Sequence, residues 1–190
     1  MRFILIVMIL LGLGSRPASA QNGGGTPLES PDARVAALDV ALYNAQANVQ
    51  EAADAEKAEL ATSVLHATLA KLLPDQLADS QAVQAALRSA SVVAAAGGQD
   101  CNVIVACARA VATAVDAPWA VMAKVSKTSN LIWLLTAQLV HAPSGTIILD
   151  DSTELKGEPE AMVRAGARIF AERVARTVRA GGVANNFPVP

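Results

Sequence analysis

Hydrophobic positions recur with two different spacings along this sequence, and the spacings predict both strands and helices. Residues 34–44 (RVAALDVALYN) carry apolar side chains on both faces of an extended segment, as in a strand covered on two sides. From about Glu51 to Leu73, apolar residues recur every three or four positions, which predicts a long helix closed by Pro74. Asp39 interrupts the strand, either as a binding carboxylate or as a strand-end residue bonded to loop amides.

The middle of the chain predicts two shorter helices and a loop between them. Residues 76–78 could form a very short strand, followed by a helix capped at residue 79 or 80 and running to about residue 90. The Ala- and Gly-rich stretch at 94–98 predicts a loop. Over residues 102–116, small apolar side chains recur at helical spacing, which predicts a helix that packs closely on a sheet.

Three strands and a last helix are predicted for the C-terminal third. Two β-rich runs, 119–127 and 130–142, are joined by the short segment Lys127–Asn130, which suits a hairpin. A Pro-Ser-Gly turn then leads into a third strand over 146–155, so the three strands form an antiparallel meander. The last helix covers 158–180, with acidic residues at its start and two glycines after its end.

Together these elements predict an α/β fold with a single mixed β-sheet. The sheet contains one N-terminal strand, a possible short second strand and the C-terminal three-stranded antiparallel meander, and it is packed with about four helices. The predicted organisation is a signal peptide over 1–20, a flexible leader over 21–33, one domain over 34–180 and a flexible tail over 181–190.

The first twenty residues have the layout of a secretory signal peptide. Arg2 supplies a positive start, Phe3 to Leu13 is an almost unbroken apolar run, and Ala18-Ser19-Ala20 is a small-x-small cleavage site. The alternative is an uncleaved anchor, but the run is short for a bilayer and no second apolar stretch follows it. We therefore expect cleavage after Ala20, no lipid attachment, no stable membrane insertion, and a periplasmic or secreted bacterial location.

Charge narrows the possible partners. Without Arg2 and Arg16, the 15 basic residues become 13 against 17 acidic ones, a net charge near −4, which argues against nucleic acid. One side of the last helix carries four arginines, which could recognise an acidic partner or a lipid headgroup. A solvated face with an Arg164–Arg168–Glu172 charge ladder is the favoured interpretation.

The two cysteines, Cys101 and Cys107, both follow the predicted cleavage site. In an oxidising compartment a disulfide is the expected state. On one regular helix, cysteines at this spacing would have Cα atoms about 9 Å apart, beyond disulfide reach, so Cys101 should precede the helix and Cys107 should lie in its first turns. Free thiols are one alternative. A metal site is another, although two thiols fall short of four ligands.

No catalytic constellation is recognisable in the sequence. His66 falls on a predicted helix, where a solvated histidine is the favoured interpretation, and His141 lies near a strand end. Asp150 and Asp151 are adjacent on a strand and should point to opposite faces, so they cannot act as an acid–base pair. We therefore expect a protein that is not an enzyme, with no catalytic residue, no metal site and no cofactor.

Two blocks of sequence resemble a family of exported bacterial domains of unknown function, related in shape to the amino-terminal domain of TolB and to CsgG. VAALDVALYN at 35–44 resembles the opening strand of that family. The block at 100–157 resembles its cysteine-flanked helix, its hairpin (VSKTSNL at 125–131) and its following turn. The cysteines are more widely spaced than in that family, and Ala123 stands where it usually has Gly. The resemblance implies the fold but no activity.

The favoured function is therefore an exported, non-enzymatic protein-interaction or cell-envelope accessory module. A sheet leaves a face or an edge for partners, and Lys127, Thr128, Ser129 and Asn130 are the candidate partner-binding residues on an exposed hairpin. Trp133 could anchor a partner, although a core position is favoured for it and for Trp119. The alternative is a periplasmic protein that binds a small ligand. The expected partner is an envelope or periplasmic protein.

Overall fold

The computed structural model describes residues 26–44, 52–97, 101, 104–129 and 132–183. The predicted signal peptide, most of the leader and most of the tail lie outside these residues. The elements follow the chain in the order β1 Val35–Ala37, β2 Ala41–Asn44, α1 Ala52–Leu72, α2 Ser80–Leu87, α3 Ala90–Ala96, α4 Val105–Ala114, β3 Trp119–Lys127, β4 Trp133–His141, β5 Thr146–Leu155 and α5 Pro159–Arg179.

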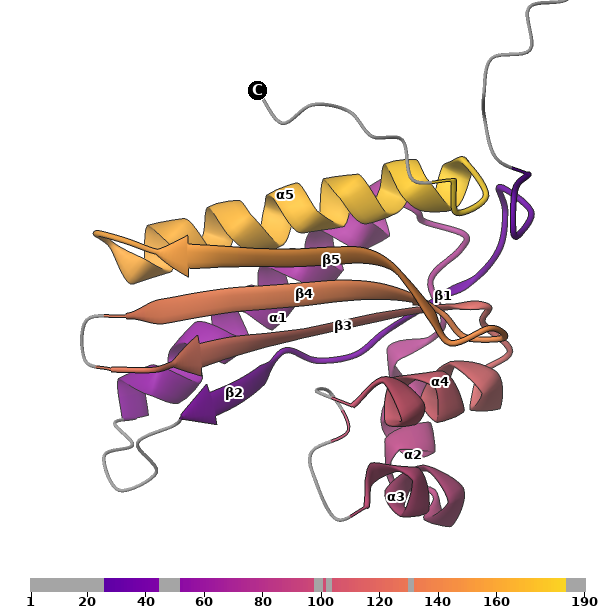
Figure 1. Cartoon of the computed structure of the whole chain (residues 1–190), viewed down its shortest axis with the longest axis horizontal. Coiled ribbons are helices and arrows are strands. Elements are labelled where there is room, and N and C mark those ends of the chain that lie inside the picture. The colour runs from indigo at the N-terminus through magenta and orange to yellow at the C-terminus, as the bar shows by residue number, and fades with distance from the viewer. Residues whose placement is uncertain (1–25, 45–51, 98–100, 102–103, 130–131, 184–190) are drawn as a thin grey trace, which may run out of the picture.

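A single mixed sheet forms the centre of the molecule, as the sequence predicts (Figure 1). Strands β3, β4 and β5 form the antiparallel meander, while β1 and β2 both pair with β3 in parallel. The possible short strand at 76–78 is present as one parallel bridge between Val35 and Leu77. The prediction of an α/β fold with one mixed sheet is confirmed, and the part of the chain that the structure describes contains five helices in place of about four.

The predicted first strand is split in two by one extra residue. Ala37 pairs with Val121 and Ala41 pairs with Lys124, so four steps along this segment match three steps along β3. An extra residue in one strand is a β-bulge, which bends the strand and leaves a residue outside the ladder. Asp39 lies in this bulge, between the two strands rather than inside one.

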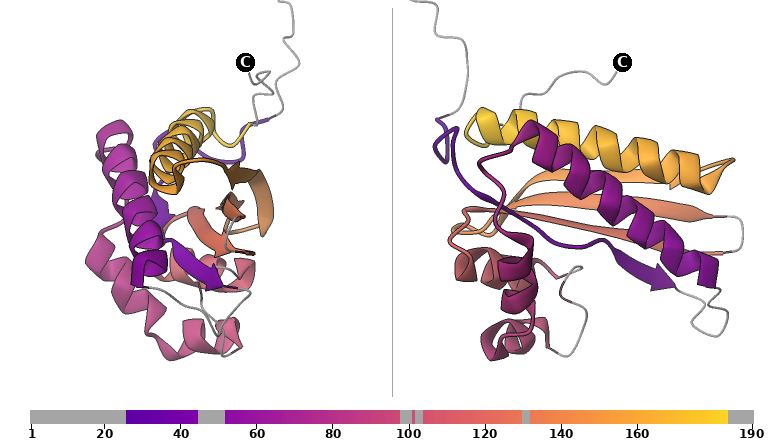
Figure 2. Two further views of the ribbon diagram at one scale, coloured as in Figure 1. Left: turned by 90° about the vertical axis from the view of Figure 1, so that its left-hand side faces the viewer. Right: turned by 180° about the vertical axis from the view of Figure 1, so that it is seen from behind.

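One face of the sheet is covered by the two long helices. In the right-hand view of Figure 2, which shows the molecule from behind, α1 and α5 lie side by side in front of the sheet. Their apolar stripes and the alternate residues of the strands form a core that includes Leu65, Trp133 and Phe170. The predicted core position of Trp133 is therefore confirmed, since 5% of it is exposed. Amphipathic spacing predicts both helices within one or two residues of their observed ends.

The opposite face is covered only in part, by the three short helices α2, α3 and α4. Their core includes Val92, Cys107 and Val111, together with Met122 and Val140 of the sheet. The predicted loop at 94–98 is wrong in part, because α3 continues to Ala96 and ends at Gly97, whose φ of 59° suits a left-handed cap. No helix of the described residues is long and apolar enough to span a membrane.

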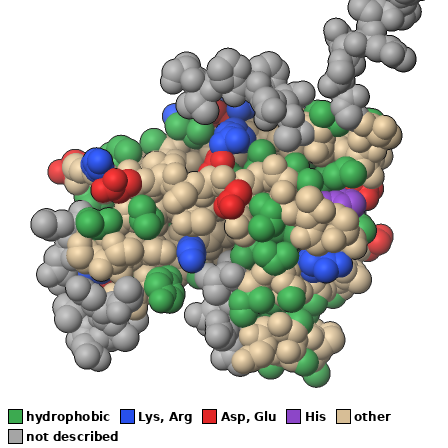
Figure 3. Space-filling view, in the orientation of Figure 1, with side chains coloured by type: hydrophobic (Ala, Val, Ile, Leu, Met, Phe, Trp, Pro, Cys, Tyr) green, Lys and Arg blue, Asp and Glu red, His purple; other side chains and the backbone are tan. Residues whose placement is uncertain are grey.

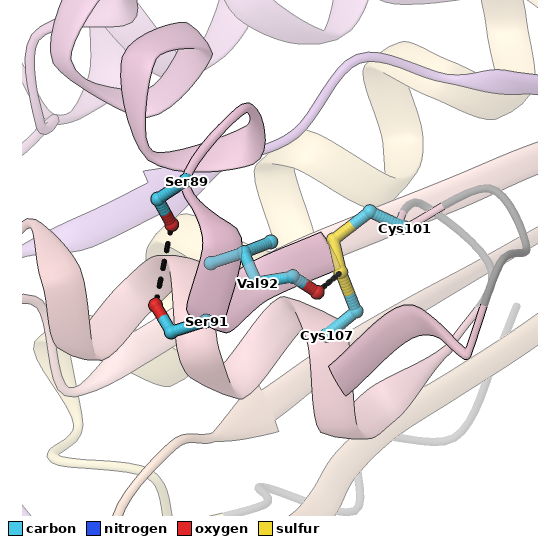
Figure 4. Close-up of a disulfide and its surroundings, with 5 residues drawn as sticks. All are labelled: Ser89, Ser91, Val92, Cys101 and Cys107. Carbon is cyan, nitrogen blue, oxygen red and sulfur yellow. Dashed lines mark hydrogen bonds between the residues drawn. A yellow bond between two sulfur atoms is a disulfide. The ribbon is translucent and has the colours of Figure 1, made fainter. Parts of the chain in front are cut away.

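A disulfide joins Cys101 to Cys107 and fastens the loop before α4 to the first turn of that helix (Figure 4). The Cα atoms are 5.2 Å apart, so the two residues occupy the positions that the spacing argument requires. The Cys107 side chain is fully buried, and its sulfur lies 3.7 Å from the carbonyl oxygen of Val92 in α3. The bond therefore stabilises the layer of short helices.

The segment before β1 is held against the C-terminal end of α5. The backbone N–H of Leu28 donates to the carbonyl of Gly181 at 2.7 Å, and the side chain of Gln76 donates to the carbonyl of Pro31 at 2.8 Å. Gly182 follows with a φ of 84°, and a Cβ there would lie 2.4 Å from the ring of Trp119. These contacts extend the folded part of the chain to residues that the sequence assigns to the leader.

Candidate protein-interaction surface

The predicted hairpin between β3 and β4 is closed by short-range hydrogen bonds. The backbone N–H and the hydroxyl of Thr128 both donate to the carbonyl of Ile132, at 3.0 and 3.1 Å. The backbone N–H of Ile132 donates to the hydroxyl of Ser129 at 3.1 Å. Thr128 is exposed and Ser129 is half-buried, while Asn130 lies outside the described residues. These bonds join the residues on the two sides of the turn, Thr128 and Ser129 before it and Ile132 after it.

Lys127 lies under the hairpin, and only 4% of it is exposed. Its ammonium donates to both carboxylate oxygens of Asp54, at 3.1 and 3.0 Å, and Asp54 is equally buried in the first turn of α1. The same ammonium lies 5.4 Å from the centre of the Trp133 ring, within range of a cation–π interaction. The expectation that Lys127 is exposed is wrong. Its side chain is buried because it pairs with the carboxylate of Asp54, which lies 73 residues earlier in the sequence.

This buried ion pair positions the hairpin without contacting a partner. Asp54 starts α1, and Lys127 ends β3, so the pair fastens the end of the meander to the start of the helix behind it. A buried pair of this kind constrains geometry strongly, since any separation leaves a charge in the apolar interior. Of the four predicted partner-binding residues, Thr128 and Ser129 remain on the outside as candidates.

Beyond the short helices, the sheet face that they leave uncovered forms a surface of its own. We call it the open face and define it by the following residues, whose side chains lie on that side of four neighbouring strands: Tyr43, Lys124, Leu134, Thr136, Gln138, Asp150, Ser152 and Glu154. Ser126 lies on the same side but is buried, with 5% of it exposed. Met122 and Val140 mark its border, because they still pack against the short helices. In Figure 3, which views this side, charged side chains are scattered among hydrophobic side chains and atoms of other kinds.

The open face is arranged in rows across the sheet. Tyr43 lies beside Ser126, which pairs with Leu134, and this row ends at Glu154. Tyr43 is 53% exposed, and the ammonium of Lys124 lies 5.5 Å from its ring centre. An exposed aromatic ring is a residue type enriched at protein-binding surfaces and among the residues that contribute most to binding. The sequence analysis did not single out Tyr43.

His66 and Asp39 lie together at the bulge between β1 and β2. The Nε2 atom of His66 is 3.3 Å from the carbonyl oxygen of Leu38 and 3.7 Å from a carboxylate oxygen of Asp39. The side chain of Gln84 in α2 donates to Asp39 at 2.7 Å. His66 lies on helix α1 as predicted, but its side chain is only partly solvated, with 29% of it exposed, and it contacts the bulge.

His141 lies between Ser144 and Glu29, so a hydroxyl, an imidazole and a carboxylate form a chain. The two distances are 2.8 Å to the Ser144 hydroxyl and 2.9 Å to the Glu29 carboxylate. The imidazole packs against the Trp119 ring at 5.0 Å, and 6% of His141 is exposed. The hydroxyl of Ser144 also bonds Thr146 at 2.8 Å. This chain fastens the segment before β1 to the end of the sheet.

A cavity of about 470 Å³ opens beside Glu29, between the start of β3 and the end of β4. Its other lining residues come from the end of α4 and the two turns next to it, and neither His141 nor Ser144 is among them. Among the described residues, no group of three or more His, Cys, Asp and Glu side chains is placed to hold a metal ion. Asp150 bonds Gln138 while Asp151 bonds Arg173, so the two lie on opposite faces as predicted.

Fold and surface together define a small mixed α/β domain whose sheet is fully covered on one side and half covered on the other. The DUF3280 family, described as "Protein of unknown function (DUF2380)", matches residues 33–174. The match spans most of the chain, so the protein belongs to that family. No curated protein matches the chain.

Solved structures show weaker likenesses. The LpoB C-terminal domain from Salmonella enterica aligns with a TM-score of 0.47 at 16% identity, covering 67% of this chain and 85% of that one. LpoB from E. coli aligns with a TM-score of 0.45 at 15% identity, covering 82% of this chain and 83% of that one. The chain of a PelC dodecamer from Paraburkholderia phytofirmans aligns with a TM-score of 0.41 at 14% identity, covering 84% of this chain and 94% of that one. With likenesses this distant, the function is argued below from this chain alone.

Proposed function

We propose that this protein is an exported, non-enzymatic protein-interaction module of the bacterial cell envelope, and that its partner binds the open face. The observation that supports this most is the half of the sheet that no described helix covers, with Tyr43 exposed on it. The same proposal relates the chain to exported domains similar to the TolB amino-terminal domain and CsgG, on the sequence blocks quoted above.

Two observations support the location. The first twenty residues have the three-part layout of a signal peptide. The disulfide between Cys101 and Cys107 is of a kind that persists in oxidising compartments and is rare in the cytosol. Both features fit a protein that folds after export, where an envelope or periplasmic protein is the available partner.

The contacts that hold the ends of β3 and β4 support the choice of surface. The Lys127–Asp54 pair and the bonds of the turn fix the end of the meander next to the open face. Binding to a preformed surface avoids the entropy cost of ordering a loop at the moment of association. Tyr43 adds a large, stiff anchor with few rotatable bonds.

Affinity capture from the envelope fraction of the native host tests the proposal. The wild-type chain is compared with Tyr43→Ala and with Val93→Ala, a control because Val93 is equally exposed, at 53%, on α3. Removing a central aromatic anchor costs about 2 kcal/mol or more, a loss of roughly thirtyfold in affinity. We expect an envelope protein to be retained by the wild type and by Val93→Ala but not by Tyr43→Ala.

Two results would contradict the proposal. Equal retention by Tyr43→Ala and by the wild type would remove the open face as the binding site. A small metabolite that co-purifies without any protein would favour the alternative, a periplasmic ligand-binding protein. Circular dichroism on each variant verifies that the fold is intact before the capture is interpreted.

A further inference from the structure

The outer edge of β5 and the groove beside it form a second surface, which borders the open face along Asp150, Ser152 and Glu154 and lies at the far side of the sheet from Tyr43. We propose that this edge accepts an added strand: an extended, basic segment of a partner protein in which apolar residues alternate with Lys or Arg. This inference is independent of the proposed function, because the added strand would pair with the backbone of β5 and insert side chains on the helix-covered side of the sheet.

The edge itself is long and open. β5 is the last strand of the sheet, and among the described strands only β4 pairs with it. It runs for ten residues, from Thr146 to Leu155, and most of them are exposed. In an antiparallel pair, about half of the backbone N–H and C=O groups of an edge strand point away from the sheet. These groups are the template that strand addition uses.

A pocket lies next to this edge, between β5 and α5, which run alongside each other at the top of Figure 1. Its volume is about 120 Å³, and its walls are mainly apolar: Leu135, Ala137, Met162, Ala165, Ile169 and Phe170 contribute most of them. An apolar cavity of roughly 150 Å³ holds a benzene molecule, so this pocket is suited to one aliphatic side chain.

Successive side chains of β5 point to opposite faces of the sheet, so one added strand could contact both the apolar pocket and the carboxylates of the open face. Asp151 and Thr153 lie on the helix-covered side and line the pocket, whereas Asp150, Ser152 and Glu154 lie on the open face. Side chains of an added strand alternate in the same way. One residue on the helix-covered side of that strand would therefore enter the apolar pocket, and the residues before and after it would lie beside Asp150, Ser152 and Glu154.

The negative charge near the β5 edge favours a basic segment over a second copy of this chain. The stretch from Asp150 to Glu160 contains five carboxylates and a single Lys. A second copy of this chain would bring its own acidic edge against this one, and like charges across a strand pair are destabilising. A basic segment is complementary to the edge. Two of the carboxylates already have a cation beside them: Asp151 pairs with Arg173, and Glu154 pairs with Lys156 at 3.2 Å, both of them exposed. A basic segment would therefore meet Asp150 unpaired by a cation and would compete with Lys156 for Glu154.

A capped heptapeptide in which Lys alternates with Val and Leu is the probe, and a block peptide of the same composition is its control. Titration is followed by NMR or fluorescence polarisation at low salt. The alternating peptide should bind at least tenfold more tightly than the block peptide, and β5 amides should become protected from hydrogen exchange. Binding should weaken as salt is added.

Variants separate the pocket from general charge. Ala165→Leu fills the pocket and should weaken binding at least tenfold, whereas Ala161→Leu, at an exposed position one turn earlier on α5, should leave it within twofold. The double variant Asp150→Lys/Glu154→Lys should prefer a peptide in which Glu replaces Lys. Tyr43→Ala should not change peptide binding, which distinguishes this surface from the open face.

Three results would overturn the inference. The first is equal binding of the alternating and block peptides. The second is binding by Ala165→Leu within twofold of the wild type, provided that the variant keeps its circular dichroism spectrum. The third is self-association of the unliganded chain through β5, detected by light scattering, which would make a second copy the occupant in place of a basic segment.

Discussion

The buried ion pair between Lys127 and Asp54 allows a quantitative test of how this fold is held at the hairpin. Replacing Lys127 with Met keeps the length of the side chain and removes its charge. Asp54→Leu removes the charge of the acid and keeps the branching of its side chain, with two methyl groups in place of the two smaller carboxylate oxygens. Each single change leaves the partner charged in a site where 4% or less of the side chain is exposed.

The size of the effect follows from the geometry. At 3.0 Å the attraction is about 5 kcal/mol for an effective dielectric constant of ~20, and most of it offsets the cost of removing both charges from water. Losing one partner leaves that cost uncompensated, so each single variant should lose about 3–5 kcal/mol of unfolding free energy. The double variant buries two apolar side chains and should lie within about 1 kcal/mol of the wild type.

Urea unfolding of the wild type, both single variants and the double variant gives the coupling free energy. The matched control is the exposed pair Arg168 and Glu172 on α5, with a distance of 2.9 Å, where replacing both by Ala should give a coupling of about 0.5 kcal/mol or less. If the coupling at Lys127 and Asp54 is no larger than in this control, the pair does not hold the hairpin and the reasoning fails.

Two further predictions concern stability. Cys101 and Cys107 close a short loop, so reducing the disulfide should cost about 2 kcal/mol and lower the Tm by roughly 4–8 °C; an unchanged Tm in reductant would be contrary to this expectation. Gly182→Ala should cost about 2–5 kcal/mol, because it combines a left-handed φ with a Cβ against Trp119. Gly157→Ala, with a similar φ and no atom within 4 Å, should cost only about 1–2 kcal/mol, and equal losses in urea unfolding would refute the Trp119 contact.

Periodic segments were predictable from the sequence because their own residues determine them. Helices α1 and α5 each carry an apolar stripe over 21 residues, and the three strands of the meander are separated by turn residues. The positions of Cys101 and Cys107 also followed from local geometry, since only a loop-to-helix arrangement brings their Cα atoms close enough.

Features that depend on distant residues were not predictable. The bulge in the first strand is held by Thr62 of α1, whose hydroxyl accepts a hydrogen bond from the backbone N–H of Val40 at 2.8 Å. Helix α3 is short, and Ser89 at its N-cap makes no capping bond, so packing of Val92 in the core defines it rather than a local signal. The burial of Lys127 depends on Asp54 in the same way.

The sequence predicts that part of the sheet stays uncovered, but not which residues form the open face. An uncovered sheet face or edge is expected for a mixed sheet with few helices, but which half stays open depends on where α2, α3 and α4 pack. Tyr43 belongs to that surface because the bulge, which adds one residue, places it beside Ser126 on the open side. Without the bulge the same residue would lie on the opposite face.

Photo-crosslinking in the living host tests the central claim, that a partner binds the open face, most directly. A photoreactive phenylalanine analogue is placed at Tyr43 in one strain and at Val93 in another, since both positions are 53% exposed. We predict one discrete adduct with an envelope protein from position 43 and none from position 93. No adduct from position 43, or the same adduct from both positions, would contradict the account.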